Sequence, residues 1–176
     1  MRQNCTIHAF EPNPVTLERF KKNLALNQTR AVVVHNLAVS DREGYAALVE
    51  TQGHSGAAYL TAGHDVEVVS LDQFCERYHI DRVDVIKVDA EGSEFAILRG
   101  AADTLSRFRP KLLMELNTPA LDRQGAASKD VLSLLMSSGY RVYRTAPYRE
   151  IPSADTEFVE QVFNVFATPG DPLTVR

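Results

Sequence analysis

Three acidic side chains occupy similar positions in this 176-residue sequence. Glu11, Asp89 and Glu115 each lie at the end of an apolar segment that reads as a β-strand. Open α/β sheets bind their ligands in the crevice beyond the carboxyl ends of their parallel strands. Because an unpaired carboxylate is costly to bury, we expect these three side chains to face that crevice and to meet a ligand there.

The position of Glu11 suits a particular ligand group. A carboxylate at such a strand end accepts hydrogen bonds from both hydroxyls of a ribose, because its two oxygens match the spacing of a vicinal diol. The alternative is local, since Glu11 precedes Asn13 and Pro14, which suit the N-cap and the first position of a helix. The sequence leaves open whether Glu11 holds a ribose or only belongs to this turn.

A second acidic cluster surrounds Gly92. Asp89 precedes the turn, Glu91 lies within it, and Glu94 begins the helix that follows. We expect Asp89 to face a cofactor, and either Asp89 or Glu91 to act as a base toward a substrate hydroxyl. Glu94 is expected to be structural, because the helix dipole favours an acid in the first turn.

Other chemistries find less support in the sequence. The nine glycines form neither a G-x-G-x-x-G nor a Walker-type loop, so the sequence holds no phosphate cradle of those types. The segment 53–56 misses the spacing of a nucleophile elbow. His54 and His64 lack the spacing of a helical zinc pair and are expected to be solvated. Two carboxylates, Asp89 and Glu115, are insufficient for a magnesium assignment, so we assign no metal ligands and the sequence leaves metal dependence open.

The elements that hold these residues alternate along the chain. Helices are predicted at 14–27, 72–78, 95–105 and 129–138. Strands are predicted at 6–10, 31–35, 83–88, 111–116, 141–144 and 160–167. The segment 31–35 is almost entirely β-branched, which is typical of a strand buried on both faces. Three short strands separated by glycines, 45–50, 57–60 and 66–71, indicate a small antiparallel insertion.

This order predicts the fold class. Strands that alternate with helices of about 10–15 residues favour an α/β fold, with a doubly wound, mostly parallel sheet and helices on both faces. The last two strands have no helix between them, so one is expected to insert antiparallel. At roughly 100–200 residues per domain, residues 1–176 form a single domain.

The composition restricts the setting and the partners. A formal net charge of −4 argues against a nucleic-acid or anionic membrane surface as the partner. No apolar run approaches the roughly 18 residues of a membrane span, and we expect no signal peptide. Cys5 and Cys75 are too few for a disulfide framework, so a reducing cytoplasm is expected.

Several motifs, in the same order along the chain, resemble those of the FkbM-type methyltransferases. The most specific is 86–94, Ile-Lys-Val-Asp-Ala-Glu-Gly-Ser-Glu, and others are 9–14, 37–41 and 69–72. The resemblance covers residues 8–169. It implies a class I, Rossmann-like fold that uses S-adenosylmethionine, usually for O-methylation of a small-molecule or sugar hydroxyl.

The resemblance also implies roles for individual residues. The residues that bind the cofactor would be Glu11 at the ribose, Asp89 beside the methionine end, Ala38 with its neighbour Leu37 around the adenine, and also Pro12. The catalytic side, facing the acceptor, would consist of Asp89, Glu91 and Glu115. Methyl transfer needs an in-line approach of the acceptor oxygen, so positioning and a carboxylate base would supply the rate.

The sequence departs from the family pattern in one respect. Members begin with a central strand and a glycine-rich Asp-x-Gly-Ala-Asn-x-Gly loop, and this sequence contains no such loop. That strand would lie between those ending at Glu11 and Asp89, and each buried backbone group left unpaired there costs about 1–3 kcal/mol. We expect a fragment of a longer enzyme. The alternatives are a non-catalytic binding or regulatory module, and a homo-oligomer in which a second chain supplies the strand.

Overall fold

Hydrogen bonding divides the strands into three sheets in the computed structural model, which describes residues 5–50 and 58–170. A two-stranded sheet consists of β1 (Ile7–Phe10) and β2 (Val32–His35). A three-stranded sheet, which we call the arm, has the order β3 (Ala38–Ser40), β5 (Ala58–Ser70), β4 (Gly44–Glu50). A five-stranded sheet has the order β6 (Val85–Val88), β7 (Lys111–Asn117), β10 (Val162–Thr168), β8 (Arg141–Thr145), β9 (Tyr148–Glu150).

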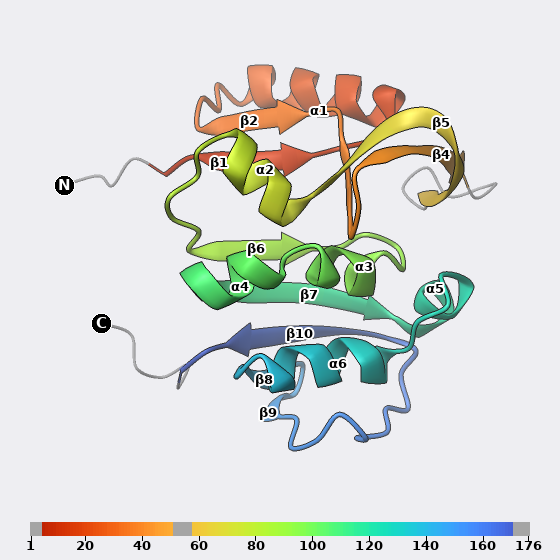
Figure 1. Ribbon diagram of the computed structural model, residues 1–176, viewed down its shortest axis with the longest axis vertical. Coiled ribbons are helices and arrows are strands. Elements are labelled where there is room, and N and C mark those ends of the chain that lie inside the picture. The colour runs from red at the N-terminus through yellow and green to blue at the C-terminus, as the bar shows by residue number, and fades with distance from the viewer. Residues whose placement is uncertain (1–4, 51–57, 171–176) are drawn as a thin grey trace.

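Six helices connect these strands in the described part of the chain. They are α1 (Pro14–Leu26), α2 (Leu71–Arg77), α3 (Glu94–Arg99), α4 (Ala102–Phe108), α5 (Thr118–Arg123) and α6 (Ser128–Ser137). Figure 1 shows α3, α4 and α6 along the five-stranded sheet, while α2 lies between that sheet and the β1–β2 pair. No helix of the described residues is long and apolar enough to cross a membrane.

The start of α1 follows the predicted capping pattern. The Asn13 side chain accepts hydrogen bonds from the backbone N–H groups of Val15 and Thr16, at 2.9 and 3.3 Å. Pro14 occupies the first helical turn, where its fixed φ suits a helix and its missing N–H leaves no donor unpaired. We call β1, α1 and β2 together the first unit.

An aromatic cluster joins the first unit to α2. His8, Phe10 and His35 present their rings on one face of the β1–β2 pair, and the ring of Phe74 from α2 packs on them with centroid distances of 5.4, 4.7 and 4.8 Å. The prediction that β2 is buried on both faces is wrong, because Val33 is 45% exposed. Among the described strands β2 pairs only with β1, so it lies at a sheet edge where water reaches its side chains.

The arm is simpler than the sequence predicts. Instead of short strands at 57–60 and 66–71, β5 runs without a break through Gly63; residue 57 lies outside the described residues. A Cβ atom on Gly63 would lie 2.3 Å from the Cβ of Ala47 on β4, so glycine lets the two strands approach and continue. The antiparallel pairing of β4 with β5 is confirmed.

One face of the five-stranded sheet carries the main core. Side chains that alternate along its strands are buried beneath the helices, among them Val88, Leu112, Met114, Leu116, Phe163 and Val165. On the opposite face Val85, Leu113 and Val162 are exposed. The prediction of helices on both faces is therefore wrong for this sheet in the part of the chain that the structure describes.

The predicted helix over 95–105 is divided into α3 and α4. A Cβ atom on Gly100 would lie 2.1 Å from the backbone oxygen of Ser40, which brings the end of α3 close against β3. The carboxylate of Asp72 on α2 then accepts hydrogen bonds from the N–H groups of Asp103 and Thr104, at 3.0 and 2.7 Å. This contact caps α4 from a neighbouring helix and makes α2 a bridge between the first unit and the larger sheet.

The closing strands confirm the predicted antiparallel insertion. Strand β10 pairs antiparallel with both β7 and β8. The predicted single, mostly parallel sheet is not found among the described strands. Three pairings are parallel, β1–β2, β3–β5 and β6–β7, and the pairings β4–β5, β7–β10, β8–β10 and β8–β9 are antiparallel.

Candidate functional site

The strands that precede the acidic residues point in one direction. Figure 1 shows the arrows of β1, β2, β6 and β7 directed the same way. Glu11 follows β1, Asp89 follows β6, and Glu115 lies near the end of β7. The three carboxylates therefore belong to the same end of the strands, and we call this end the acidic rim.

The two strands nearest the middle of the acidic rim each have one open edge. Among the described residues β1 pairs only with β2, and β6 pairs only with β7. Figure 1 shows β6 as the next strand across the molecule from β1, and no ladder joins them in the described part of the chain.

Glu11 is held partly by its own turn. One carboxylate oxygen accepts the N–H of Asn13 at 2.8 Å, which supports the local interpretation of this residue. The Asn36 side chain donates to the backbone oxygens of both Glu11 and Pro12, at 3.0 Å each. The second carboxylate oxygen of Glu11 has no hydrogen bond among the described residues, so it is open to a ligand. Asn36 was not predicted from the sequence. The feature that could have identified it is an amide side chain directly after a predicted strand.

Two predicted cofactor residues belong to the core. Leu37 is 9% exposed and packs with Val69 and Phe74, and Ala38 is 3% exposed within the arm. Pro12 is half-buried beside Glu11. The side chains of Leu37 and Ala38 thus offer little surface to an adenine in this structure.

Asp89 forms an ion pair on the surface. Its carboxylate lies 2.9 Å from Nζ of Lys87, and both side chains are about half exposed or more. The register of β6 and β7 places Val88 beside Met114, so Asp89 and Glu115 follow at neighbouring positions. Glu115 itself is half-buried and has no hydrogen bond among the described side chains.

The turn after Asp89 has an unusual backbone. Glu91 has a φ of 49°, in the left-handed region that non-glycine residues rarely adopt, and Gly92 follows with a φ of 105°. A Cβ atom on Gly92 would lie 2.3 Å from the backbone oxygen of Ala120. The Glu91 carboxylate accepts a hydrogen bond from the Asn117 side chain at 3.4 Å, and Asn117 also caps α5 by accepting the N–H of Ala120. The turn is thus fitted tightly against α5.

Glu94 has a role that the sequence did not predict. Its side chain is buried, and Oε1 accepts hydrogen bonds from the N–H groups of Ala90 and Gly92 at 3.0 and 3.2 Å. It therefore binds the turn that precedes α3, whereas an acid in the first turn was expected to act on the helix end. Burial raises the pKa of this carboxyl, and the backbone donors oppose that rise.

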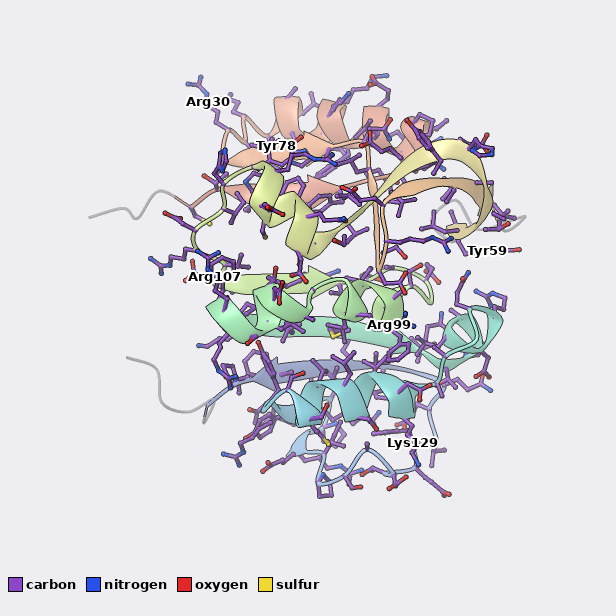
Figure 2. All side chains as sticks on the ribbon, in the orientation of Figure 1. Arg30, Tyr59, Tyr78, Arg99, Arg107 and Lys129 are labelled. Carbon is purple, nitrogen blue, oxygen red and sulfur yellow. The ribbon has the colours of Figure 1, made fainter. Side chains whose placement is uncertain are left out.

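A cavity of about 350 Å³ adjoins the turn. The arm, α3 and the end of α5 enclose it, and Gly92 and Ser93 form part of its wall. Arg99 on α3 pairs with Asp41 at 2.9 Å, and Gln124 donates to the backbone oxygen of Leu60 at 3.2 Å. Figure 2 shows Arg99 on α3, with Tyr59 toward the end of the arm.

Among the described residues, no group of three or more histidine, cysteine, aspartate or glutamate side chains is placed to hold a metal ion. The chain is a mixed α/β protein, and its three carboxylates lie at the end of the parallel strands where open α/β sheets generally bind their ligands.

The chain belongs to the FkbM methyltransferase family. A sequence model of the methyltransferase FkbM domain matches residues 1–142, which is most of the chain.

Relatives and a solved structure agree with this family. The chain is 29% identical to "Methyltransferase 1" of Beauveria bassiana (strain ARSEF 2860), over 78% of this chain and 63% of the relative. It is 24% identical to the "2-O-methyltransferase NoeI" of Sinorhizobium fredii, over 62% of this chain and 53% of the relative. The structure also resembles a crystal structure of the methyltransferase FkbM from Methylobacillus flagellatus KT, with a TM-score of 0.54 and 19% identity. The match covers 93% of this chain and 36% of the chain in that crystal structure. The chain thus spans between about half and two thirds of these curated relatives' length.

Proposed function

We propose that this chain carries the site of an S-adenosylmethionine-dependent methyltransferase that methylates a hydroxyl of a small molecule or sugar. The observation that carries the proposal is the common direction of β1, β6 and β7, which brings Glu11, Asp89 and Glu115 to one rim. Family membership supports methyl transfer, and the printed activity of NoeI, a 2-O-methyltransferase, supports oxygen as the acceptor atom.

The residues present fit part of the cofactor. Glu11 has one carboxylate oxygen without a partner among the described residues, which suits a ribose hydroxyl. The bound cofactor would supply a methyl group on a positively charged sulfur. Asp89 would lie beside that group, and its ion pair with Lys87 would orient its carboxylate. Glu91 or Glu115 would accept the proton of the acceptor hydroxyl as its oxygen is alkylated.

The proposal includes a Rossmann-like sheet with one strand position open. β1 and β6 run in the same direction, and each has an unpaired edge in the described part of the chain. One extended segment between them would pair with both edges and would join the first unit to the larger sheet. The family's glycine-rich loop would then follow that segment at the acidic rim, between Glu11 and Asp89.

A second candidate function follows from the same open edges. The chain would be a non-catalytic binding or regulatory module derived from a methyltransferase, since no glycine-rich loop accompanies Glu11 in the sequence. A homo-oligomer in which another copy supplies the strand is a variant of the catalytic proposal. In each case we propose a cytoplasmic protein that binds neither nucleic acid nor membrane, in keeping with the net charge of −4.

Calorimetry with S-adenosylmethionine separates these proposals. We expect the 176-residue chain to bind weakly or not at all, and a protein extended by its in-frame upstream sequence to bind at about micromolar Kd. Tight binding by the 176-residue chain would contradict the open strand position. Failure of the extended protein to bind would favour the non-catalytic module.

The role of Glu11 has its own test in the protein that binds. Glu11→Gln should weaken binding about tenfold, because a charge-assisted hydrogen bond to the ribose is lost. Glu18→Gln, at an exposed position on α1, is the matched control and should leave the affinity unchanged. Equal affinities of the two variants would remove Glu11 from the site. Transfer of a labelled methyl group to a panel of hydroxylated small molecules then tests catalysis.

A further inference from the structure

The carboxyl of Glu94 is buried at a place where a structural role in α3 does not explain it. Only 1% of the residue is exposed, although it is the first residue of a short helix. Its Oε1 accepts from the amides of Ala90 and Gly92, which precede the helix, and no partner of Oε2 is found among the described residues. An acid that only favoured the helix dipole would stay solvated at lower cost.

The turn that Glu94 binds needs an external support. Glu91 lies in the left-handed region, which costs a non-glycine residue free energy and persists only where the surroundings fix it. Those surroundings are visible on two sides. The Glu94 carboxyl holds the amides on either side of Glu91, and the backbone of α5 lies against Gly92 at Ala120.

The conformation of the turn determines where the Glu91 side chain lies. With φ at 49°, its carboxylate meets the Asn117 side chain at the end of β7, at 3.4 Å. An extended or right-handed helical backbone at residue 91 would send the side chain in another direction. The position of Glu91 at the acidic rim therefore depends on the two hydrogen bonds from the turn to Glu94.

We propose that Glu94 is a positioning residue, which fixes the turn of residues 90–92 and thereby aims the Glu91 carboxylate at the end of β7. This inference rests on the proposed function insofar as it makes Glu91 the carboxylate that is held ready for the acceptor hydroxyl. It distinguishes Glu91 from Asp89, whose carboxylate is paired with Lys87 on the surface. The residue that sequence reasoning treated as structural would then control the chemistry through its neighbour.

The test uses NMR on the 176-residue chain without any ligand. In Glu94→Ala, hydrogen exchange of the Ala90 and Gly92 amides should accelerate about tenfold, because each amide loses its hydrogen bond to a carboxyl. The Asn117 side-chain amide and the Glu91 carboxyl carbon should shift as their contact is lost. The control is Asp103→Ala, which removes an exposed acid from the first turn of α4 and should leave all these signals unchanged.

Two conservative variants keep the test decisive if Glu94→Ala does not fold. Glu94→Gln retains an acceptor oxygen and should preserve the Glu91 and Asn117 signals. Glu94→Asp retains the carboxyl but is one methylene shorter, and should disturb both signals. A folded Glu94→Ala or Glu94→Asp variant with unchanged Glu91 and Asn117 signals would overturn the proposal. Because no cofactor is present, failure of the methyltransferase assignment cannot produce this result.

A final measurement tests the functional half of the inference. Binding of S-adenosylhomocysteine to the catalytically competent protein should be unchanged by Glu94→Asp, whereas the maximal rate of methyl transfer should fall at least about tenfold. A rate that stays unchanged while the Glu91 signals move would show that the position of Glu91 does not matter for transfer, and would overturn this half.

Discussion

The first unit and the five-stranded sheet bury their side chains to very different extents. In the larger sheet, Leu112, Leu116 and Val165 are inaccessible to water beneath α3, α4 and α6. In the first unit no residue of β1 or β2 is fully buried, and the buried residue of α1 is Leu17. A layer of two strands cannot exclude water as a layer of five strands does.

This difference matters because the candidate site draws on both regions. Glu11 belongs to the weakly buried first unit, whereas Asp89 and Glu91 follow β6 of the larger sheet and Glu115 lies on its β7. The carboxylates proposed for the acceptor thus follow or lie on strands that carry the main core, whereas the carboxylate proposed for the ribose belongs to a unit with few buried residues. We expect the two regions to respond differently to perturbation.

The largest expected effect is in the core of the larger sheet. Leu132→Ala on α6 removes a fully buried side chain and should lower the free energy of unfolding by about 2–5 kcal/mol, through lost burial and the cavity left behind. Leu26→Ala at the end of α1, where the leucine is 81% exposed, should change it by less than about 0.5 kcal/mol. Urea unfolding measures both, and similar losses in the two variants would contradict the contrast.

A smaller effect is expected at the acidic rim. Gly92→Ala places a methyl group against the backbone oxygen of Ala120 in a backbone conformation that alanine disfavours, and should destabilise the fold by about 1–3 kcal/mol. Gly125→Ala is the matched control, because its φ is also positive at 74° but nothing lies within 4 Å. Thermal unfolding should therefore rank Gly92→Ala as the more damaging change. The reverse order would mean that the turn does not pack on α5.

The smallest effect is a pH dependence of the first unit. Burial, and secondly the neighbouring His8, lower the pKa of His35. The unfolded chain then binds a proton more readily than the folded one, so the free energy of unfolding should decrease as the pH falls below the ordinary value of 6.5. Replacing His35 by Phe should reduce this slope, while the same change at the exposed His64 should leave it intact. Urea titrations at several pH values give the slopes; a wild-type slope in His35→Phe would exclude this cause.

Local signals in the sequence predicted local structure well. Asn13 and Pro14 identified the start of α1, because a cap depends on a side chain and the amides two or three residues away. The acidic residues at the ends of β1, β6 and β7 were also predictable, since strand ends follow from apolar runs.

Features that depend on distant contacts could not be read in this way. The break between α3 and α4 arises where Gly100 meets Ser40, and the continuity of β5 depends on Ala47 opposite Gly63. The exposure of Val33 depends on which strands flank β2, and the second role of Glu94 depends on which amides its carboxyl reaches. Each involves a partner that spacing along the chain does not reveal.

The bridging position of α2 has a consequence for ligand affinity. Its Phe74 packs on the rings of the first unit, and its Asp72 binds the amides that open α4. The distance between the carboxylate proposed for the ribose and those proposed for the methyl acceptor therefore depends on α2, whose seven residues lie outside the proposed site. A substitution on α2 that moves the first unit relative to the larger sheet would change this distance, and would therefore weaken the binding of cofactor and acceptor together.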